Sequence, residues 1–290
     1  MKNLIKSILA KIMYFLYKNK VLHNPIRVMS MDENLDELIN TNKSMVRFGD
    51  GEVVLIKGAD LVLQKSSPMI VDKMKQLLEY EYDDLLVTIP DIFDSLEHHH
   101  KKSKEFWMEH LFFCRKYYHR YCNKSKTYGQ TSVSRAYYQF ADRDPCAGWF
   151  EKIRNIWKAK DIVVVEGTAT HNGVGNDLLD LAASVSRIIC PPKNAMDVYD
   201  QILAACKEYP KDRLFIVSLG VTAKFLVEDL YKEGYRVLDM GNVDMEYEWF
   251  LQKAEGKVSV EKHQILSLEE NEAAGYTKYL AEIEKVIKGR

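Results

Sequence analysis

Two acidic motifs stand out because their spacing could serve a bound cation or a proton transfer. One is the pair Asp50 and Glu52 in RFGDGE, and the other is the pair Asp244 and Glu246 in VDMEYEW. Closely spaced carboxylates with no cysteine or paired histidine beside them favour a hard divalent ion such as Mg²⁺ or Mn²⁺. Each pair also has a simpler explanation: a solvated glycine turn for the first, and acids at the positive end of a helix for the second. Asp50 and Glu52 could equally accept hydrogen bonds from sugar hydroxyls or act as a base.

The stretch EGTATHNGVGNDLLD (166–180) has features of a phosphate site. Gly173 and Gly175 lead into a predicted helix that Asn176 or Asp177 would cap. Glycines let the backbone approach a ligand, and the free N–H groups of a helix start attract phosphate. The stretch matches neither G-x-G-x-x-G nor a P-loop, so an ordinary helix-entry turn is the alternative.

Two more loops follow apolar runs and could form further anion-binding sites. In SLGVTAKFL, Gly220 ends the run and Thr222 falls in the first turn of a predicted helix. In CPPKNAMD, Lys193 could neutralise a phosphate, although a loop lysine is more often solvated. Arg47 in RFGDGE and Arg135 in YGQTSVSR have the side chain best suited to bidentate contacts with phosphate.

The elements that position these loops can be predicted from hydrophobic patterns. From residue 160 to 240, apolar runs alternate with helical patterns, which predicts parallel strands and a Rossmann-like, doubly wound α/β sheet with helices on both faces. Ligands bind at the carboxyl ends of strands in such sheets, so the loops above should meet there. The predicted strands are 45–48, 85–89, 126–129, 161–167, 186–190, 213–220 and 235–241, and the predicted helices are 69–80, 104–122, 133–141, 148–158, 176–185, 194–208, 222–233 and 268–288.

Composition narrows the class of protein. The 290 residues carry a net charge of −1, which makes no case for nucleic-acid binding. Five scattered cysteines without a C-x-x-C pair fit free thiols in a reducing cytoplasm better than disulfides or zinc. No linker or repeat divides the chain, so we expect a single domain over 25–290 that follows a separate N-terminal helix over 1–24.

That N-terminal segment, MKNLIKSILAKIMYFLYKNK, is basic and amphipathic. It has five lysines and no acid, and its apolar residues gather on about one half of a helix. The lysines interrupt the apolar run, so the segment is too short to span a bilayer, and no cleavage site for a signal peptidase follows it. It fits peripheral binding to the anionic inner face of the cytoplasmic membrane; packing on the body of the protein or on a second subunit, as a homo-oligomer, is the alternative.

Several blocks together resemble a known family. RFGDGE, YGQTSVSR, EG…GVGNDLLD, CPPKNAMDVYDQIL, SLGVTAKFLVEDL and MGNVDMEYEWF occur in the same order as in the GT-D fold glycosyltransferases, and the likeness covers about residues 30–255. The resemblance implies a Rossmann-like core, a UDP-sugar donor and a divalent metal bound through Asp-x-Glu. It therefore implies transfer of a hexose, such as glucose or galactose, to a bacterial surface glycan, glycoprotein glycan or lipid-linked oligosaccharide.

The resemblance also assigns roles. Mn²⁺ or Mg²⁺ would lie on Asp244 and Glu246, which leaves Asp50 and Glu52 as the catalytic acids facing sugar and acceptor. The resemblance and the loops above together predict the nucleotide-sugar site to comprise Arg47, Arg135, Gly167, His171, Gly173, Gly175, Asn176, Asp177, Lys193, Asn194, Gly220 and Thr222.

This chain departs from the family pattern at two places beside the expected site. It has Ala169, Thr170 and His171 in place of a basic or polar pair, and Asn242 in place of a histidine, so the donor sugar stays open. Two other functions are considered: a nucleotide-dependent Rossmann oxidoreductase, and a sugar-nucleotide-binding protein without catalysis. The missing G-x-G-x-x-G argues against the first, and the second predicts UDP binding without turnover.

Overall fold

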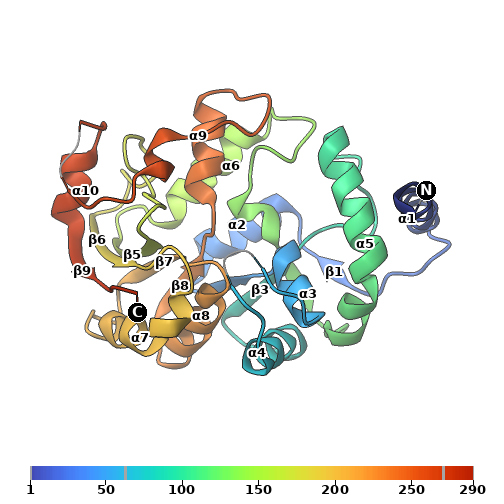
Figure 1. Cartoon of the computed structure of the whole chain (residues 1–290), viewed down its shortest axis with the longest axis horizontal. Coiled ribbons are helices and arrows are strands. Elements are labelled where there is room, and N and C mark those ends of the chain that lie inside the picture. The colour runs from blue at the N-terminus through green and yellow to red at the C-terminus, as the bar shows by residue number, and fades with distance from the viewer. Residues whose placement is uncertain (1, 62–63, 270–271, 290) are drawn as a thin grey trace.

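A parallel sheet forms the centre of the protein (Figure 1). The computed structural model describes residues 2–61, 64–269 and 272–289. Nine strands lie in the order β1-β4-β3-β2-β8-β7-β5-β6-β9, and neighbouring strands run parallel throughout. The predicted doubly wound α/β fold is therefore confirmed. The strands are β1 Arg27–Val28, β2 Ser44–Arg47, β3 Leu85–Ile89, β4 Thr127–Gln130, β5 Asp161–Gly167, β6 Ser184–Cys190, β7 Leu214–Ser218, β8 Arg236–Asp239 and β9 Ile283–Val286.

Helices cover both faces of the sheet, as the apolar runs of its strands require. Helices α3, α4, α5, α7 and α8 pack on one face, and α2, α6 and α9 on the other. Their bounds are α1 Lys2–Lys18, α2 Met31–Asn40, α3 Asp50–Ile56, α4 Pro68–Glu79, α5 Lys101–Tyr121, α6 Cys146–Ile156, α7 Tyr199–Lys207, α8 Thr222–Lys232, α9 Val243–Leu251 and α10 Tyr276–Glu282, with 3₁₀ turns η1 Thr131–Ser134, η2 Ala195–Val198 and η3 Glu261–Gln264.

Helix α1 lies at one end of the molecule, against α5 (Figure 1). It buries Ala10, Tyr14 and Tyr17 in the core on that face, so it packs on the same body as the rest of the chain. Residues on its other side, among them Ile12 and Phe15, are exposed. None of the helices in the described part of the chain is both long enough and apolar enough to cross a membrane.

Three predicted helices differ from the structure. Residues 133–141 form only the end of η1 and turns, and 176–185 form turns up to the start of β6. In the second case Gly173 and Gly175 have positive φ, and the carbonyl of Leu178 accepts a bond from the Trp157 indole instead of joining a helical ladder. The helix predicted over 268–288 is only α10, because residues 283–286 extend the sheet beside β6. Residues 270 and 271 of this predicted helix lie outside the described residues.

Candidate functional site

The strand order places a topological switch point between β2 and β8, and the carboxyl-end side of this point is here called the crevice. The helix that follows β2 packs on one face of the sheet, and the helix that follows β8 packs on the other. Loops diverge at such a point, which is where open α/β sheets bind ligands. Strand β2 ends at Arg47 and β8 ends at Asp239, so both side chains lie at this crevice.

Four charged side chains form a buried ionic cluster at the crevice, here called the crevice cluster: Arg47, Glu52, Lys224 and Asp239. The Lys224 Nζ atom lies 2.8 Å from Asp239 Oδ2 and 3.0 Å from Glu52 Oε1. The Arg47 Nη1 atom lies 4.0 Å from Asp239 Oδ1. Each residue is less than a tenth exposed. Two positive and two negative charges balance one another, as buried ions must.

The two predicted catalytic acids differ in environment. Burial opposes ionisation of Glu52, but the charge of Lys224 and its hydrogen bond outweigh burial and hold the Glu52 pKa below its ordinary value. The other oxygen of Glu52 accepts the Gly49 N–H at 2.7 Å and caps α3. Asp50, in the first turn of α3, is half-buried, and its carboxylate has no hydrogen-bond partner among the described residues. Glu52 is thus ionised and bonded at both oxygens, whereas the Asp50 carboxylate has no such partner among the described residues.

Arg47 is held against the loop after β8. A Cβ atom on Gly241, which has φ +46°, would lie 1.8 Å from Arg47 Nη1, so any larger residue there would strain the backbone and displace the guanidinium. The Arg47 Nε–H donates to the Thr131 carbonyl at 3.3 Å. Arg135, which caps η1, is close enough to lower the Arg47 pKa, although burial lowers it more. The two predicted arginines therefore lie close enough to interact electrostatically.

Three buried hydroxyl groups lie at the neighbouring strand ends. The hydroxyls of Thr88 at the end of β3, and of Thr131 and Ser134 in η1, have no hydrogen-bond partner within the described chain. Buried polar groups are seldom left unpaired, so this side of the crevice suits water or a polar ligand.

The loop after β7 also opens at this edge. Gly220 has φ +55°, is exposed, and a Cβ there would meet nothing within 4 Å. Thr222 is buried at the first position of α8. The Lys224 ammonium donates to the Gly220 carbonyl at 3.1 Å, which joins this loop to the crevice cluster.

Asp244 and Glu246 do not converge on a common ion. Both lie in the first turn of α9, and side chains two positions apart point to different sides of a helix. Glu246 accepts the backbone N–H groups of Tyr137 and Tyr138 at 3.2 and 2.8 Å, whereas Asp244 faces the loop at Gly173. Across the described residues, no three His, Cys, Asp or Glu side chains are grouped to hold a metal. As arranged here, this pair does not fit the predicted metal.

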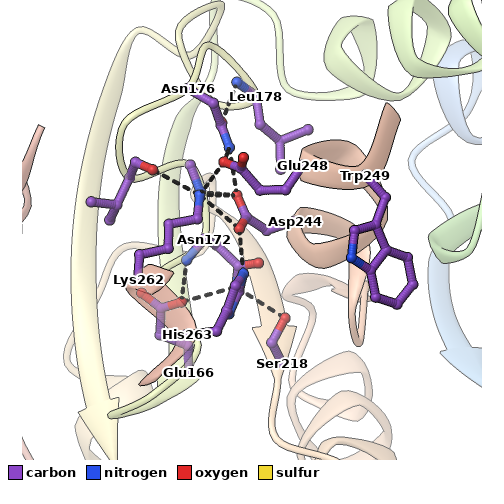
Figure 2. Close-up of polar contacts among 12 residues, drawn as sticks. Glu166, Asn172, Asn176, Leu178, Ser218, Asp244, Glu248, Trp249, Lys262 and His263 are labelled. Atoms are coloured by element: carbon purple, nitrogen blue, oxygen red, sulfur yellow. Dashed lines mark hydrogen bonds and ion pairs between the residues drawn. The ribbon is translucent and has the colours of Figure 1, made fainter. Parts of the chain in front are cut away.

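Asp244 is surrounded by donors (Figure 2). Its Oδ1 accepts the Gly173 N–H at 2.7 Å and the Asn176 amide at 3.0 Å, and its Oδ2 lies 2.8 Å from His263 Nε2. Lys262 adds an ion pair at 2.8 Å. Burial would raise the pKa of Asp244, but His263 and Lys262 hold it below its ordinary value.

The glycine loop expected to hold phosphate is partly exposed and lines a cavity of about 340 Å³, but several of its polar groups are bonded within the chain. The Gly173 N–H is used by Asp244, and a Cβ on Gly175 would lie 2.9 Å from the Ala274 carbonyl oxygen. Asn176 also donates to Glu248 at 2.6 Å, and Asp177 accepts from the Tyr247 hydroxyl at 2.6 Å. These glycines serve close packing, and the two polar residues hold α9.

The remaining predicted residues lie farther along the edge. Gly167 ends β5, and His171 is fully buried beside the rings of Tyr276 and Tyr279, where burial lowers its pKa to about 4. Two strands, β7 and β5, separate the crevice from β6, and the loop after β6 carries the exposed residues Lys193 and Asn194. The structure does not bring Lys193 or Asn194 to the crevice.

Sequence reasoning missed three residues. Asp239 lies near the carboxyl end of the strand predicted over 235–241, where ligands were expected, so its position was a usable signal. Lys224 looks like any helical lysine in sequence. Asp91 follows β3 and lines a cavity of about 790 Å³ together with Asp94 and Phe93. Burial, helped by Asp94, raises the Asp91 pKa to about 6.

Comparison with known proteins places this site in context. The family model of glycosyltransferases with the GT-D fold matches residues 45–267. Curated relatives include a probable glycosyl transferase of Streptococcus gordonii, 40% identical over 81% of this chain, and a glycosyltransferase of Streptococcus pneumoniae, 38% identical over 80%. The chain spans about a third of the length of these relatives: 34% of the first and 29% of the second.

Solved structures are similar over nearly the whole chain. One, described as a new glycosyltransferase from Streptococcus sanguinis, is 37% identical, covers 91% of this chain and 100% of its own, and superposes with a TM-score of 0.84. Another, described as having a distinct glycosyltransferase fold, is 33% identical, covers 97% of this chain and 100% of its own, and has a TM-score of 0.85.

Proposed function

The chain belongs to the family of glycosyltransferases with the GT-D fold, and from that premise we propose that it transfers a hexose, glucose or galactose, from a UDP-sugar to a glycan acceptor. The acceptor is a bacterial surface glycan, a glycoprotein glycan or a lipid-linked oligosaccharide. The observation that carries the proposal is the crevice between β2 and β8, where Arg47 lies close enough to Arg135 and Asp50 to interact electrostatically with both, and the Asp50 carboxylate has no hydrogen-bond partner among the described residues.

In this proposal the crevice residues divide the work. Arg47 and Arg135 bind the diphosphate, because guanidinium groups match its oxygens and stabilise the charge that builds as it leaves. The exposed loop at Gly220 lets the donor approach the start of α8. Asp50 accepts the acceptor hydroxyl and, in an inverting reaction, takes its proton. Glu52, ionised and bonded at both oxygens, fixes the start of α3 and thereby the position of Asp50.

A divalent ion, Mn²⁺ or Mg²⁺, stays part of the proposal. When bound, such an ion would neutralise charge on the diphosphate. Because Asp244 and Glu246 point apart, no step of the reaction is assigned to it.

The test is release of UDP from a panel of UDP-sugars, with and without acceptor glycan and divalent ion. We expect Asp50→Asn to lower kcat about 100-fold or more, since a positioned base contributes that much. The matched control, Asp212→Asn, changes an exposed acid just before the amino end of β7 and should leave kcat unchanged. Full activity in Asp50→Asn would remove Asp50 from the mechanism, and binding of UDP without release from any UDP-sugar would favour a protein without catalysis.

Helix α1 would bring this activity to a membrane. Lys6, Lys11 and Lys18 are exposed beside its exposed apolar side, and the described helix contains no acid. Basic amphipathic helices bind anionic lipid surfaces in this way. We therefore propose peripheral contact with the anionic inner face of the cytoplasmic membrane, where lipid-linked acceptors would be reached.

A further inference from the structure

Lys262 occupies a position at which a cation is surrounded by oxygen atoms. It lies on η3 and is 8% exposed. Its Nζ atom is 2.7 Å from the Val174 carbonyl oxygen, 3.0 and 2.8 Å from the two oxygens of Asp244, and 2.8 Å from Glu248 Oε1. Figure 2 shows the side chain reaching between the two carboxylates.

This arrangement has the donor chemistry of a hard-cation site, filled from within the chain. Two carboxylates and a carbonyl are the ligand types that Mg²⁺ and Mn²⁺ take. The distances are those of ammonium hydrogen bonds and not the 2.0–2.1 Å that Mg²⁺ requires. The ammonium has three N–H donors, and its nitrogen lies within 3.0 Å of all four oxygen atoms, so each of them has a positive charge beside it.

The negative charges of Asp244 and Glu248 explain why a cation is needed between them. Asp244 is almost fully buried, and the Glu248 side chain is 15% exposed. Two carboxylates this close repel each other unless a positive charge lies between them. Asn176 donates to both and holds them together, but it brings no charge. Lys262 is the ammonium group that ion-pairs with both carboxylates.

We propose that Lys262 is a built-in cation of the Asp244–Glu248 site and that it competes with divalent metal there. While its ammonium is in place, these carboxylates do not bind a divalent ion; once the ammonium is gone, they do. The proposal changes the expected metal partner of Asp244 from Glu246 to Glu248. It rests on the proposed function only for its relevance to catalysis, since ion binding can be measured without any sugar transfer.

The experiment measures Mn²⁺ binding, by electron paramagnetic resonance of the free ion and by calorimetry, in the full chain without donor or acceptor. Lys262→Met keeps the aliphatic stem and removes the charge. We expect it to bind Mn²⁺ at least 10-fold more tightly than the wild type, and Asp244→Asn added to it should abolish the gain. Lys278→Met is the matched control, because Lys278 pairs with Asp180 at the surface, and it should bind as the wild type does.

Thermal melting is a second measurement, which tests the proposal even if the Lys262 variants are less stable. Without its lysine the site holds two carboxylates that repel each other, so Lys262→Met and the milder Lys262→Gln should have lower melting temperatures than the wild type. Mn²⁺ should raise the melting temperature of both variants by several degrees and leave that of the wild type unchanged. Equal Mn²⁺ affinity in wild type and both variants would overturn the proposal, as would a gain that survives Asp244→Asn. Failed sugar transfer with this binding pattern intact would overturn the proposed function and not the lysine site.

Discussion

Lys224 shows what the type of a single residue cannot reveal. In the sequence it is a lysine in a predicted helix, which is usually solvated, yet the fold buries it between Glu52 and Asp239. Asp50 and Glu52 could be selected from sequence as acids near a site. Their different roles could not, because the difference depends on Lys224, which lies more than a hundred residues away along the chain. Pairings across such distances are set by tertiary structure and not by local pattern.

Asp91 provides a prediction at the residue scale. Its folded pKa of about 6 lies above the ordinary aspartate value. The folded state therefore binds this proton more tightly than the unfolded state, so its stabilising effect is full below about pH 4 and is lost as pH rises through about 6. Asp91→Asn should raise the free energy of unfolding at pH 8 by up to about 3 kcal/mol and leave it nearly unchanged at pH 4.

Urea unfolding at the two pH values measures this effect. Asp83→Asn, which changes an exposed acid just before the amino end of β3, is the control and should change the free energy of unfolding by less than about 0.5 kcal/mol at either pH. An equal change at pH 4 and pH 8 for Asp91→Asn would show that the carboxyl titrates normally.

At the scale of elements, strong periodicity predicted strands correctly, whereas the spacing of a short acidic motif did not predict the directions of its side chains. The runs DIVVVEG and LLVTI are strands with the predicted bounds, because strands buried on both faces require continuous apolar residues. The Asp-x-Glu pair at Asp244 suggested two ligands of one ion, but α9 begins at Val243 and helical geometry turns the two acids apart. The loop after β5 resembled a helix start, yet positive φ at its glycines ends any helical path.

Helix α1 provides the prediction at this scale. At about 100° per residue, its exposed residues Ile8, Ile12 and Phe15 lie about half a turn from Tyr14 and Tyr17, which face α5. The more apolar side therefore faces outward, with Lys11 and Lys18 at one margin and Lys6 at the other. Wild type should sediment with vesicles containing phosphatidylglycerol, less so at high salt, and Ile8→Asp with Ile12→Asp should bind at least 10-fold more weakly.

The matched control places the same change on another surface. Leu251→Asp with Leu266→Asp alters two exposed apolar residues away from α1 and should bind vesicles as the wild type does. If the wild type does not bind, or the α1 variant binds equally well, the helix has no membrane role. If the wild type is instead a dimer that the α1 variant separates, this face is a contact between copies.

For the molecule as a whole, the class of fold was predictable and the strand order was not. Alternating strands and helices require a parallel sheet, but only the tertiary structure places β8 beside β2 and thereby creates the crevice. The edges of the sheet were missed for the same reason. Strand β1 has two residues, and β9 lies inside a stretch whose pattern reads as helix. An edge strand is defined by the neighbour it covers, and local sequence does not identify that neighbour.

The C-terminal segment should therefore matter to the whole sheet. A chain that ends at Gly275 loses β9, which pairs with β6, and the buried rings of Tyr276 and Tyr279. It also loses Glu282, whose carboxylate accepts the Arg187 Nε–H at 2.7 Å. Loss of a buried aromatic side chain alone costs about 3–5 kcal/mol, and the uncovered edge of β6 offers unpaired backbone groups to another chain. We expect a melting temperature lower by several degrees and aggregation in light scattering, whereas a chain ending at Ile287, which keeps β9, should match the full protein. Unchanged melting and a monodisperse truncated protein would show that β5–β8 are stable without β9 as an edge.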